Sequence, residues 1–478
     1  MPAPPEPASN VNPPAPPAPP AAPAAPAAPA ALTGEPPRGS QRRALMAVLM
    51  AVSLATLDST ITGTALPRIA ADLQAQPAAA IWVINAYQLV VVAGLLPFAA
   101  LGDRLGARRV HLFGLAFFVL ASLASALAGS LPALAAARAL QGLGAAAMMS
   151  VNIALVRQLY PAHQLGRGVG LNALVVGVSF AAGPTLASLL LSVLSWPWLY
   201  LLNLPLGLLA FWVAYSALPR RATQGAPIDR LAALLTALCF ASAIGALSAA
   251  TQRVAWGWVL ACALLALASG SWLLRRQADH SAPMLPMDLL RRPLFALSAV
   301  TALAAFAAQS LAFVSLPFFL ENVLQRNPLQ TGFLMAPWAI VVAAAAPLAG
   351  RLSERYPPGL LGGIGLLLLS GGLVSLGLLT PAATASDIIW RLALCGAGFG
   401  LFQSPNLNAL MSAAPPERSG GASGMVAMAR LNGQAIGAAL VALCFGLAGA
   451  QGPVWALLLG GAFAGVAALV SGARLLLR

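Results

Sequence analysis

Long apolar runs, separated by short polar stretches, fill the chain from about residue 44 to its end. A helix needs about 20 apolar residues to cross the ~30 Å hydrocarbon core of a bilayer. Fourteen runs reach that length, with approximate limits 44–66, 80–101, 109–129, 131–156, 168–192, 197–217, 229–249, 254–274, 294–320, 330–350, 359–379, 384–411, 421–448 and 453–474. The pattern predicts an all-α membrane protein with fourteen transmembrane helices.

The polar stretches between the runs differ in charge, and every second one is basic. The basic stretches carry Arg104, Arg108, Arg109, Arg157, Arg167, Arg220, Arg221, Arg275, Arg276, Arg291, Arg292, Arg351, Arg355 and Arg418. The other stretches have only Arg68, Arg253 and Arg326. Because arginine-rich loops stay in the cytoplasm, we expect a multi-pass protein of the inner membrane with both termini cytoplasmic.

Composition agrees with a bilayer environment. Only 8% of the residues are charged, whereas a soluble domain has roughly 25%. The net charge of +14 comes from arginines in short clusters between the runs, which indicates membrane topology and no nucleic-acid partner. The four cysteines lie in apolar runs without CxxC spacing, so we expect neither a metal site nor disulfides.

The chain divides into four parts. Residues 1–40 are rich in proline and alanine and almost uncharged, so we expect a disordered cytoplasmic tail that is dispensable for function. Residues 41–217 are predicted to form an N-terminal six-helix bundle, and residues 293–478 a C-terminal one. The region 218–292 then holds an inserted pair of helices, the seventh and eighth, with flanking loops.

The two predicted bundles repeat one another. "AALGDRLGARR" closes the second helix of the first bundle, and "GRLSERY" closes the second helix of the other. Arg138 follows Asp103 by 35 residues, and Arg391 follows Glu354 by 37 residues. A duplicated helical bundle with a cavity between its halves is the architecture of a secondary transporter.

Several motifs resemble those of the major facilitator superfamily, and specifically its fourteen-span drug:proton antiporters. They are "LDSTITGTALPRI" in the first span, "ALGDRLGARR" after the second, "LAAARALQGLGAA" in the fourth, "SWPWLYLLNLPLG" in the sixth and "RLNGQAIGAAL" in the thirteenth. Gly183 and Pro184 keep part of the fifth-span antiporter motif. The resemblance implies the major facilitator fold, with proton antiport as the activity.

Two opposite charges stand at similar depth in different spans. Asp58 lies ~21 Å into a helix that starts in the cytoplasm, and Arg138 lies ~11 Å into one that starts outside. The two side chains can therefore face each other. A carboxylate that pairs with arginine in only one state changes its affinity for protons, so we expect Asp58 and Arg138 to couple proton movement. The alternative is a permanent structural ion pair.

The loop motif and its repeat lie at the membrane boundary. There an acid can meet a helix N-terminus or an arginine and hold one conformation closed. The resemblance links such residues to gating, and the gating-loop candidates are Asp103, Arg104, Gly106, Glu354 and Arg355. Gly183 and Pro184 allow close helix contact and bending, although simple packing explains these residues equally well.

Aromatic, amide and charged side chains within the spans are candidates for a substrate cavity. A flat or cationic amphiphile would find ring faces and hydrogen-bonding groups there. The candidates are Tyr87, Gln88, Gln141, Phe306, Gln309, Phe313, Arg391, Phe402 and Gln403. The alternative is that most of these residues only pack between helices.

The sequence favours a monomeric, proton-driven exporter of hydrophobic or cationic small molecules, which uses the proton gradient and no cofactor. An exporter or importer of one metabolite on the same fold stays open as an alternative. A membrane enzyme is disfavoured because His111, His163 and His280 lie at or near loops without a nucleophile arrangement. A primary pump is disfavoured because there is no phosphate-binding GxxxxGK[ST] loop.

Overall fold

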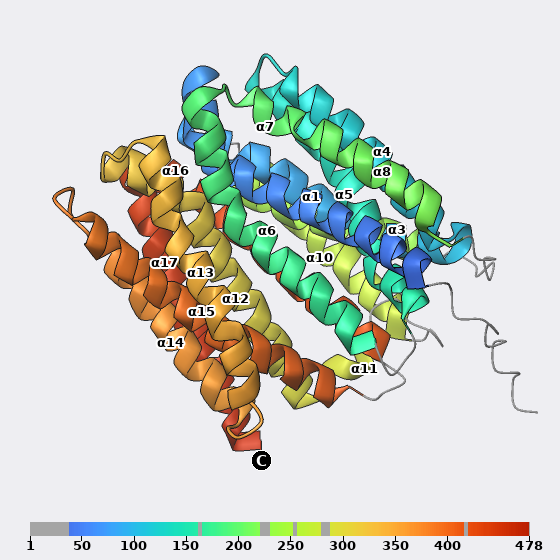
Figure 1. Cartoon of the computed structure of the whole chain (residues 1–478). Coiled ribbons are helices and arrows are strands. Elements are labelled where there is room, and N and C mark those ends of the chain that lie inside the picture. Colours follow the sequence, from blue (N-terminus) through green and yellow to red (C-terminus); the bar gives the residue numbers. More distant parts are fainter. Residues whose placement is uncertain are drawn as a thin grey trace, which may run out of the picture.

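The computed structural model describes residues 38–160, 165–219, 230–251, 256–278, 287–414 and 419–477. Every regular element in these ranges is helical, as the apolar runs predict (Figure 1). The tail expected over residues 1–40 falls almost wholly outside the described residues.

Eight helices form the N-terminal half. They are α1 (Arg38–Asp72), the short α2 (Pro77–Ala80), α3 (Trp82–Leu105), α4 (Ala107–Ala126), α5 (Leu131–Leu159), α6 (Leu165–Val193), the short α7 (Pro197–Leu201) and α8 (Asn203–Ala217). An inserted pair follows, α9 (Arg230–Thr251) and α10 (Trp256–Ala278). These two helices pack on each other, and α9 also contacts α3 and α16, so the pair lies against both halves.

The C-terminal half begins with the short α11 (Met287–Leu290). It continues with α12 (Pro293–Phe318), a π-helical turn (Phe319–Val323), α13 (Pro328–Leu352), α14 (Pro358–Gly377), α15 (Ala385–Ala413), α16 (Ser419–Ala448) and α17 (Gly452–Ala473). The turns Gly449–Gln451 and Arg474–Leu477 are 3₁₀-helical. Figure 1 shows the two halves side by side, with α6 next to the C-terminal half.

Twelve stretches of the described residues are long and apolar enough to cross a membrane. One of them, Gly424–Leu476, has 53 residues and contains α17 and most of α16. The described apolar part of α9 is only Leu234–Ala243. The all-helical membrane fold is therefore confirmed with twelve candidate spans, whereas the predicted count of fourteen is not.

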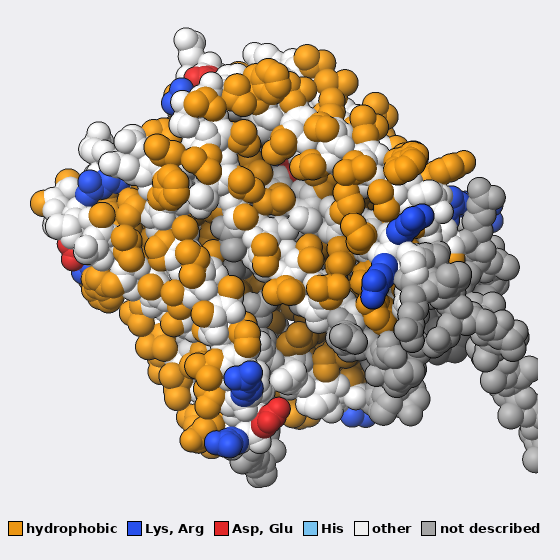
Figure 2. Space-filling model, in the orientation of Figure 1, with side chains coloured by type: hydrophobic (Ala, Val, Ile, Leu, Met, Phe, Trp, Pro, Cys, Tyr) orange, Lys and Arg blue, Asp and Glu red, His pale blue; other side chains and the backbone are white. Residues whose placement is uncertain are grey.

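The described exterior carries many large hydrophobic side chains. Figure 2 shows hydrophobic side chains across most of one face, with arginines and acids mainly toward its edges. Large hydrophobic side chains such as Trp212, Trp258 and Leu469 are exposed. A surface of this kind suits hydrocarbon rather than water, because a soluble monomer rarely exposes extensive apolar patches.

The two halves contact each other at more than one level of the bundle, because Met428, Leu431, Ala435 and Ala439 of α16 pack in the core of the N-terminal half and a second cluster lies at one end. We call the end where α1 begins the near end and the opposite end the far end. An apolar cluster toward the far end joins α1, α12 and α16 across the halves, and its members include Ile61, Leu66, Ile69, Leu311, Val314, Phe318, Val441 and Phe445. Thr185 of α6 also donates a hydrogen bond to the carbonyl oxygen of Gly332 in α13 at 3.4 Å. These contacts close the far end between the halves.

Candidate functional site

A buried ion pair between α1 and α5 lies inside the N-terminal half. Nη1 of Arg138 is 2.5 Å from Oδ2 of Asp58, and each side chain is 1% exposed. The sequence predicted that these two side chains can meet, and the structure brings them together. Because removing charges from water is costly, such a pair persists only if further hydrogen bonds satisfy both groups.

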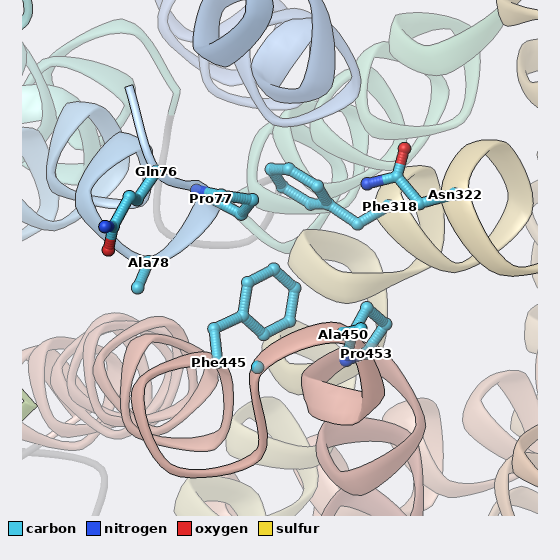
Figure 3. Close-up of a pocket in the computed structure, with 9 residues that line it drawn as sticks. Gln76, Pro77, Ala78, Phe318, Asn322, Phe445, Ala450 and Pro453 are labelled. Carbon is cyan, nitrogen blue, oxygen red and sulfur yellow. The ribbon is translucent and has the colours of Figure 1, made fainter. Parts of the chain in front are cut away.

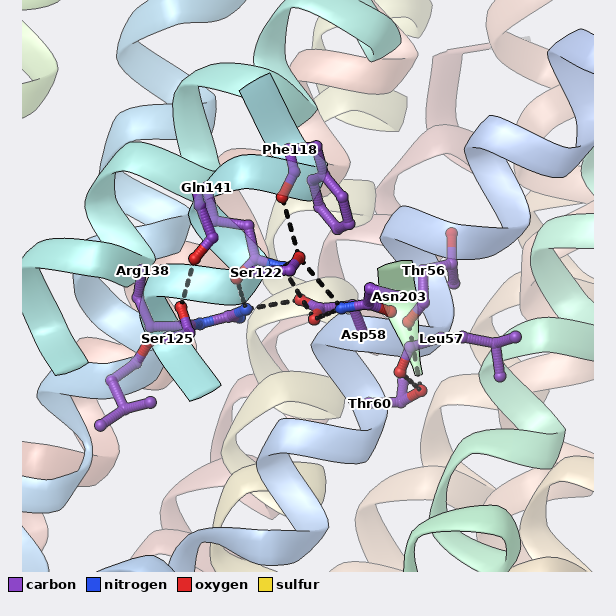
Figure 4. Close-up of polar contacts among 12 residues, drawn as sticks. Thr56, Leu57, Asp58, Thr60, Phe118, Ser122, Ser125, Arg138, Gln141 and Asn203 are labelled. Atoms are coloured by element: carbon purple, nitrogen blue, oxygen red, sulfur yellow. Dashed lines mark hydrogen bonds and ion pairs between the residues drawn. The ribbon is translucent and has the colours of Figure 1, made fainter. Parts of the chain in front are cut away.

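The other carboxylate oxygen of Asp58 accepts two hydrogen bonds from amides. Nδ2 of Asn203 donates at 2.6 Å and Nε2 of Gln141 donates at 2.9 Å, both to Oδ1 (Figure 4). Oγ of Ser122 accepts from the same two amide nitrogens, at 2.8 Å from Gln141 and 3.3 Å from Asn203. Side chains from four helices, α1, α4, α5 and α8, thus meet at this carboxylate.

The guanidinium of Arg138 is equally well surrounded. Nε donates to the carbonyl oxygen of Val83 at 3.3 Å, and Nη1 donates to Oε1 of Gln141 at 2.5 Å. Its Cζ lies 4.4 Å from the ring centre of Tyr87 and 5.5 Å from that of Tyr200. Cation–π contacts of this kind stabilise a desolvated cation.

Sequence reasoning missed three members of this cluster, namely Ser122, Tyr200 and Asn203. Asn203 and Tyr200 lie inside "SWPWLYLLNLPLG", a stretch that carries the family resemblance, and a buried asparagine in an apolar span was the available signal. Ser122 gave no comparable signal. Of the predicted cavity residues, Tyr87 and Gln141 belong to this ion-pair cluster.

A small central pocket separates this cluster from the C-terminal half. It measures about 50 Å³ and is lined by Ser59, Thr60, Gly63, Ile84, Gln88, Phe180, Gln309, Ser310, Phe313, Val314 and Gln434. Gln88, Gln309 and Phe313 were predicted for the cavity, and the ring of Phe313 meets that of Phe180 at 4.6 Å. Drug-sized ligands need roughly 300 Å³ or more, so in the described conformation this pocket is too small to hold one.

Comparison with known proteins identifies the family. The model of the Major Facilitator Superfamily matches residues 48–438. The chain belongs to the Major Facilitator Superfamily. It is therefore a transporter of that superfamily and not an enzyme.

The relatives of this facilitator cover most of its length. The uncharacterised transporter YebQ of Escherichia coli strain K12 is 48% identical over 90% of this chain and 95% of its own. The riboflavin transporter RibZ of Clostridioides difficile is 27% identical over 84% and 87%. The multidrug resistance protein Stp of Mycobacterium tuberculosis is 31% identical over 84% and 75%. A crystal structure of a POT family transporter, bound to a thioalcohol-conjugated peptide, shares the fold with a TM-score of 0.70 at 16% identity, covering 90% of this chain and 95% of the other.

The remaining predicted cavity residues of the facilitator lie away from the central pocket. Phe306 and Phe402 belong to the core of the C-terminal half, where both rings pack against Phe399. Gln403 is exposed. Nη1 of Arg391 lies 3.4 Å from Oδ1 of Asp387, one helical turn away in α15.

The predicted gating loops lie at the near end of the facilitator. Asp103 and Arg104 are exposed in the last turn of α3, and Glu354 and Arg355 are exposed in the turn after α13. No described basic group lies within 4 Å of Asp103 or Glu354. Gly106 joins α3 to α4 with φ of 94°, a conformation that favours glycine. The positive φ angle between α3 and α4 therefore explains why glycine occupies this position of the motif.

The fifth-span glycine brings α6 onto α1. A Cβ atom at Gly183 would overlap the side chain of Thr60, which lines the central pocket. Pro184 is buried next to it, and its carbonyl oxygen would lie 2.7 Å from a Cβ atom at Gly332 of α13. Gly183 and Pro184 thus lie where α6 packs against both halves.

A second pocket opens at the far end between the halves. It measures about 390 Å³ and is lined by Gln76, Pro77, Ala78, Phe318, Asn322, Phe445, Gly449, Ala450 and Pro453. Figure 3 shows the rings of Phe318 and Phe445 between Pro77 and Pro453, and their centres are 5.1 Å apart. The lining residues carry no charge.

Proposed function

We propose that this facilitator is a proton-coupled efflux transporter of hydrophobic, amphiphilic small molecules. The observation that carries this proposal is the carboxylate of Asp58, buried in the middle of a transmembrane helix and matched by one arginine. Carboxylates at that depth are costly and commonly serve in ion or proton pathways. Similarity to Stp, whose name is that of a multidrug resistance protein, supports export of drug-like compounds.

Helix α1 contributes both to the proposed proton site and to the central pocket, so it can link substrate binding to proton transfer. Asp58 faces α4, α5 and α8, while its neighbours Ser59 and Thr60 line the central pocket. A shift of α1 as substrate enters would therefore disturb the contacts of Asp58. Losing Arg138 favours the protonated form of the carboxylate, and regaining it favours proton release. In this proposal Asp58 carries the exchanged proton and Arg138 expels it.

We propose fourteen spans, with the near end and both termini in the cytoplasm. The arginine pattern and the separate helices α16 and α17 support this, together with the packing of α9 on α10. Reporter fusions at Gly225 and Thr251 test the seventh span. We expect a cytoplasmic and a periplasmic signal respectively, and the same side for both fusions would remove that span.

We propose that the loops holding Asp103, Arg104, Glu354 and Arg355 close the near end when the far end opens. Each loop follows the second helix of its half, so equivalent contacts form at equivalent places. In the described conformation the far end is closed and these acids are unpaired among the described residues. The partners of such a latch would thus form only in the other conformation.

A second candidate function is export or import of one specific metabolite. Its support is the 27% identity to RibZ, a riboflavin transporter. A resistance panel in an efflux-deficient host decides between the two, with Asp58→Asn as the transport-dead control. Raised tolerance to several unrelated compounds supports drug efflux. Tolerance to none, together with uptake or release of a single metabolite, would replace it.

A further inference from the structure

Arg430 of α16 is a cation that has no partner among the described residues. Its Nε atom is buried, no described residue accepts a hydrogen bond from its guanidinium, and no described carboxylate lies within 4 Å. An unpaired charge inside a transmembrane helix is costly, and such residues commonly mark substrate or ion pathways. The proton-coupling proposal uses Asp58 and Arg138 and leaves Arg430 without a task.

The position of Arg430 places it next to the central pocket. It lies 11 residues into α16, or ~16 Å from the near end of the helix. Gln434, which lines the pocket, follows it by four residues and therefore shares its side of the helix. Arg430 thus extends the wall of the pocket toward the near end, where a compound would enter from the cytoplasm.

Among the residues that the structure describes, Arg430 has no counter-ion at this depth. Asp58 is already engaged by Arg138, Gln141 and Asn203. The other acids whose side chains the structure describes lie at helix ends or in turns, namely Asp72, Asp103, Glu321, Glu354 and Asp387. With the Asp58–Arg138 pair neutral as a unit, Arg430 leaves the pocket with one net positive charge.

Arg474 shows what a structural arginine looks like in the same half. It is buried and has no described carboxylate partner, yet Nη1 donates to Oγ of Ser298 at 3.0 Å and to Oδ1 of Asn406 at 2.7 Å. Its Nε and Nη2 donate to Ser471. Neutral groups therefore suffice to satisfy a buried guanidinium here, and Arg430 lacks them.

We propose that Arg430 binds an anionic group of the transported compound, so that the substrates are planar aromatic acids with a carboxylate or phenolate. This inference rests on the proposed export function and narrows its substrate class away from cations. Phe180 and Phe313 offer ring faces, and Gln88, Gln309 and Gln434 offer amide groups around the same pocket. An arginine fork matches a carboxylate with two parallel hydrogen bonds.

The anion site and the proton site lie on different halves. Asp58 points into the N-terminal half, whereas Arg430 belongs to α16 of the C-terminal half. An anion at Arg430 therefore need not displace the carboxylate from Arg138. Coupling between the two sites then runs through the relative movement of the halves.

Equilibrium binding to the purified full-length protein tests the assignment, with two dyes of one ring system as probes. Fluorescein is anionic and rhodamine 123 is cationic, and both are followed by fluorescence polarisation. We expect tighter binding of fluorescein, weakened about 10- to 100-fold in Arg430→Gln and less strongly in Arg430→Lys, which keeps the charge but loses the two-pronged geometry. Rhodamine binding should not weaken in Arg430→Gln. The control Arg351→Gln, at an exposed arginine of α13, should bind both dyes as the wild type does.

The proposal is overturned if wild-type protein binds rhodamine 123 more tightly, fails to bind fluorescein, or binds it equally well as Arg430→Gln. Thermal unfolding of each variant shows whether it is folded. A separate measurement of dye export with and without a pH gradient tests proton coupling. Charge selectivity without coupling would sink the antiport proposal alone, and coupling without charge selectivity would sink only the role of Arg430.

Discussion

Each half carries an arginine near the start of an equivalent helix and pairs it with an aspartate, but the two pairs have different surroundings. In the N-terminal half, Arg138 of α5 reaches Asp58 of α1 at 2.5 Å, and both side chains are 1% exposed. In the C-terminal half, Arg391 of α15 lies 3.4 Å from Asp387 of its own helix, and the side chains are 19% and 42% exposed. The first pair joins two helices in a desolvated core, whereas the second lies within one helix and is partly exposed.

The repeat thus preserves the position of the arginine but not its partner or its burial. Asp387 caps α15 through hydrogen bonds with Thr384, and the guanidinium of Arg391 lies 4.3 Å from the ring centre of Trp390. Salt bridges that water can reach contribute little, while breaking a buried one is costly. We therefore expect the halves to be functionally unequal, with proton coupling confined to the N-terminal half.

The largest expected effect is that of Asp58→Asn on export. The neutral amide removes the titrating group, so export against a gradient should fall to the level of vesicles without the protein. Asp387→Asn is the matched change in the other half and should export almost normally. Substrate accumulation in everted membrane vesicles measures both. Equal losses of export in the two variants would contradict the proposal that only the N-terminal half couples protons.

Arg138→Ala comes next, because it leaves the carboxylate of Asp58 buried without its cation. Removing one partner of a buried pair costs about 3–5 kcal/mol, so the thermal midpoint in detergent should fall clearly and export should be impaired. The double variant Asp58→Asn/Arg138→Gln removes both charges and should recover most of the stability but no export. A double variant as unstable as Arg138→Ala would show that charge is not the cause.

Asn203→Ala should have an intermediate effect. It deletes the 2.6 Å hydrogen bond to Oδ1 of Asp58 and leaves the bond from Gln141. A hydrogen bond to a charged group contributes about 1.5–3 kcal/mol, so we expect a smaller fall of the thermal midpoint than in Arg138→Ala, with partial export. If Asn203→Ala matched the wild type in both measurements, the amide of Asn203 would contribute neither to stability nor to export.

Arg391→Ala should have the smallest effect. The side chain is partly exposed and its described carboxylate partner lies at the surface of the same helix. We expect export and thermal midpoint close to those of the wild type, measured beside Arg138→Ala in one preparation. An export defect as deep as that of Arg138→Ala would mean that both halves take part in coupling.

The sequence sufficed for features that depend on charges in apolar surroundings. Few ionisable residues lie within the spans, so Asp58 and Arg138 stood out, and counting residues from opposite faces placed them at one depth. Asn203 and Ser122 come from other helices, and only tertiary packing brings them to the carboxylate.

The cavity was harder to predict, because membrane helices are apolar on every side. The most apolar segment of α12 and its π-helical turn has 89% of its residues buried, whereas the equally apolar segment of α13 has only 33% buried. Hydropathy therefore could not tell Phe313 at the pocket from Phe306 in the core of the C-terminal half. Arg391 repeats the position of Arg138 in the sequence, but Asp387 one turn before it supplies a local partner, so the repeat does not predict a place in the cavity.

The most direct test of the central claim is substrate-induced proton movement in proteoliposomes that hold a pH-sensitive dye. Wild-type protein and Asp387→Asn should exchange protons for a transported compound, and Asp58→Asn should show none at equal amounts of folded protein. Wild-type exchange by Asp58→Asn would contradict the assignment and turn attention to Glu321, at the far end of α12.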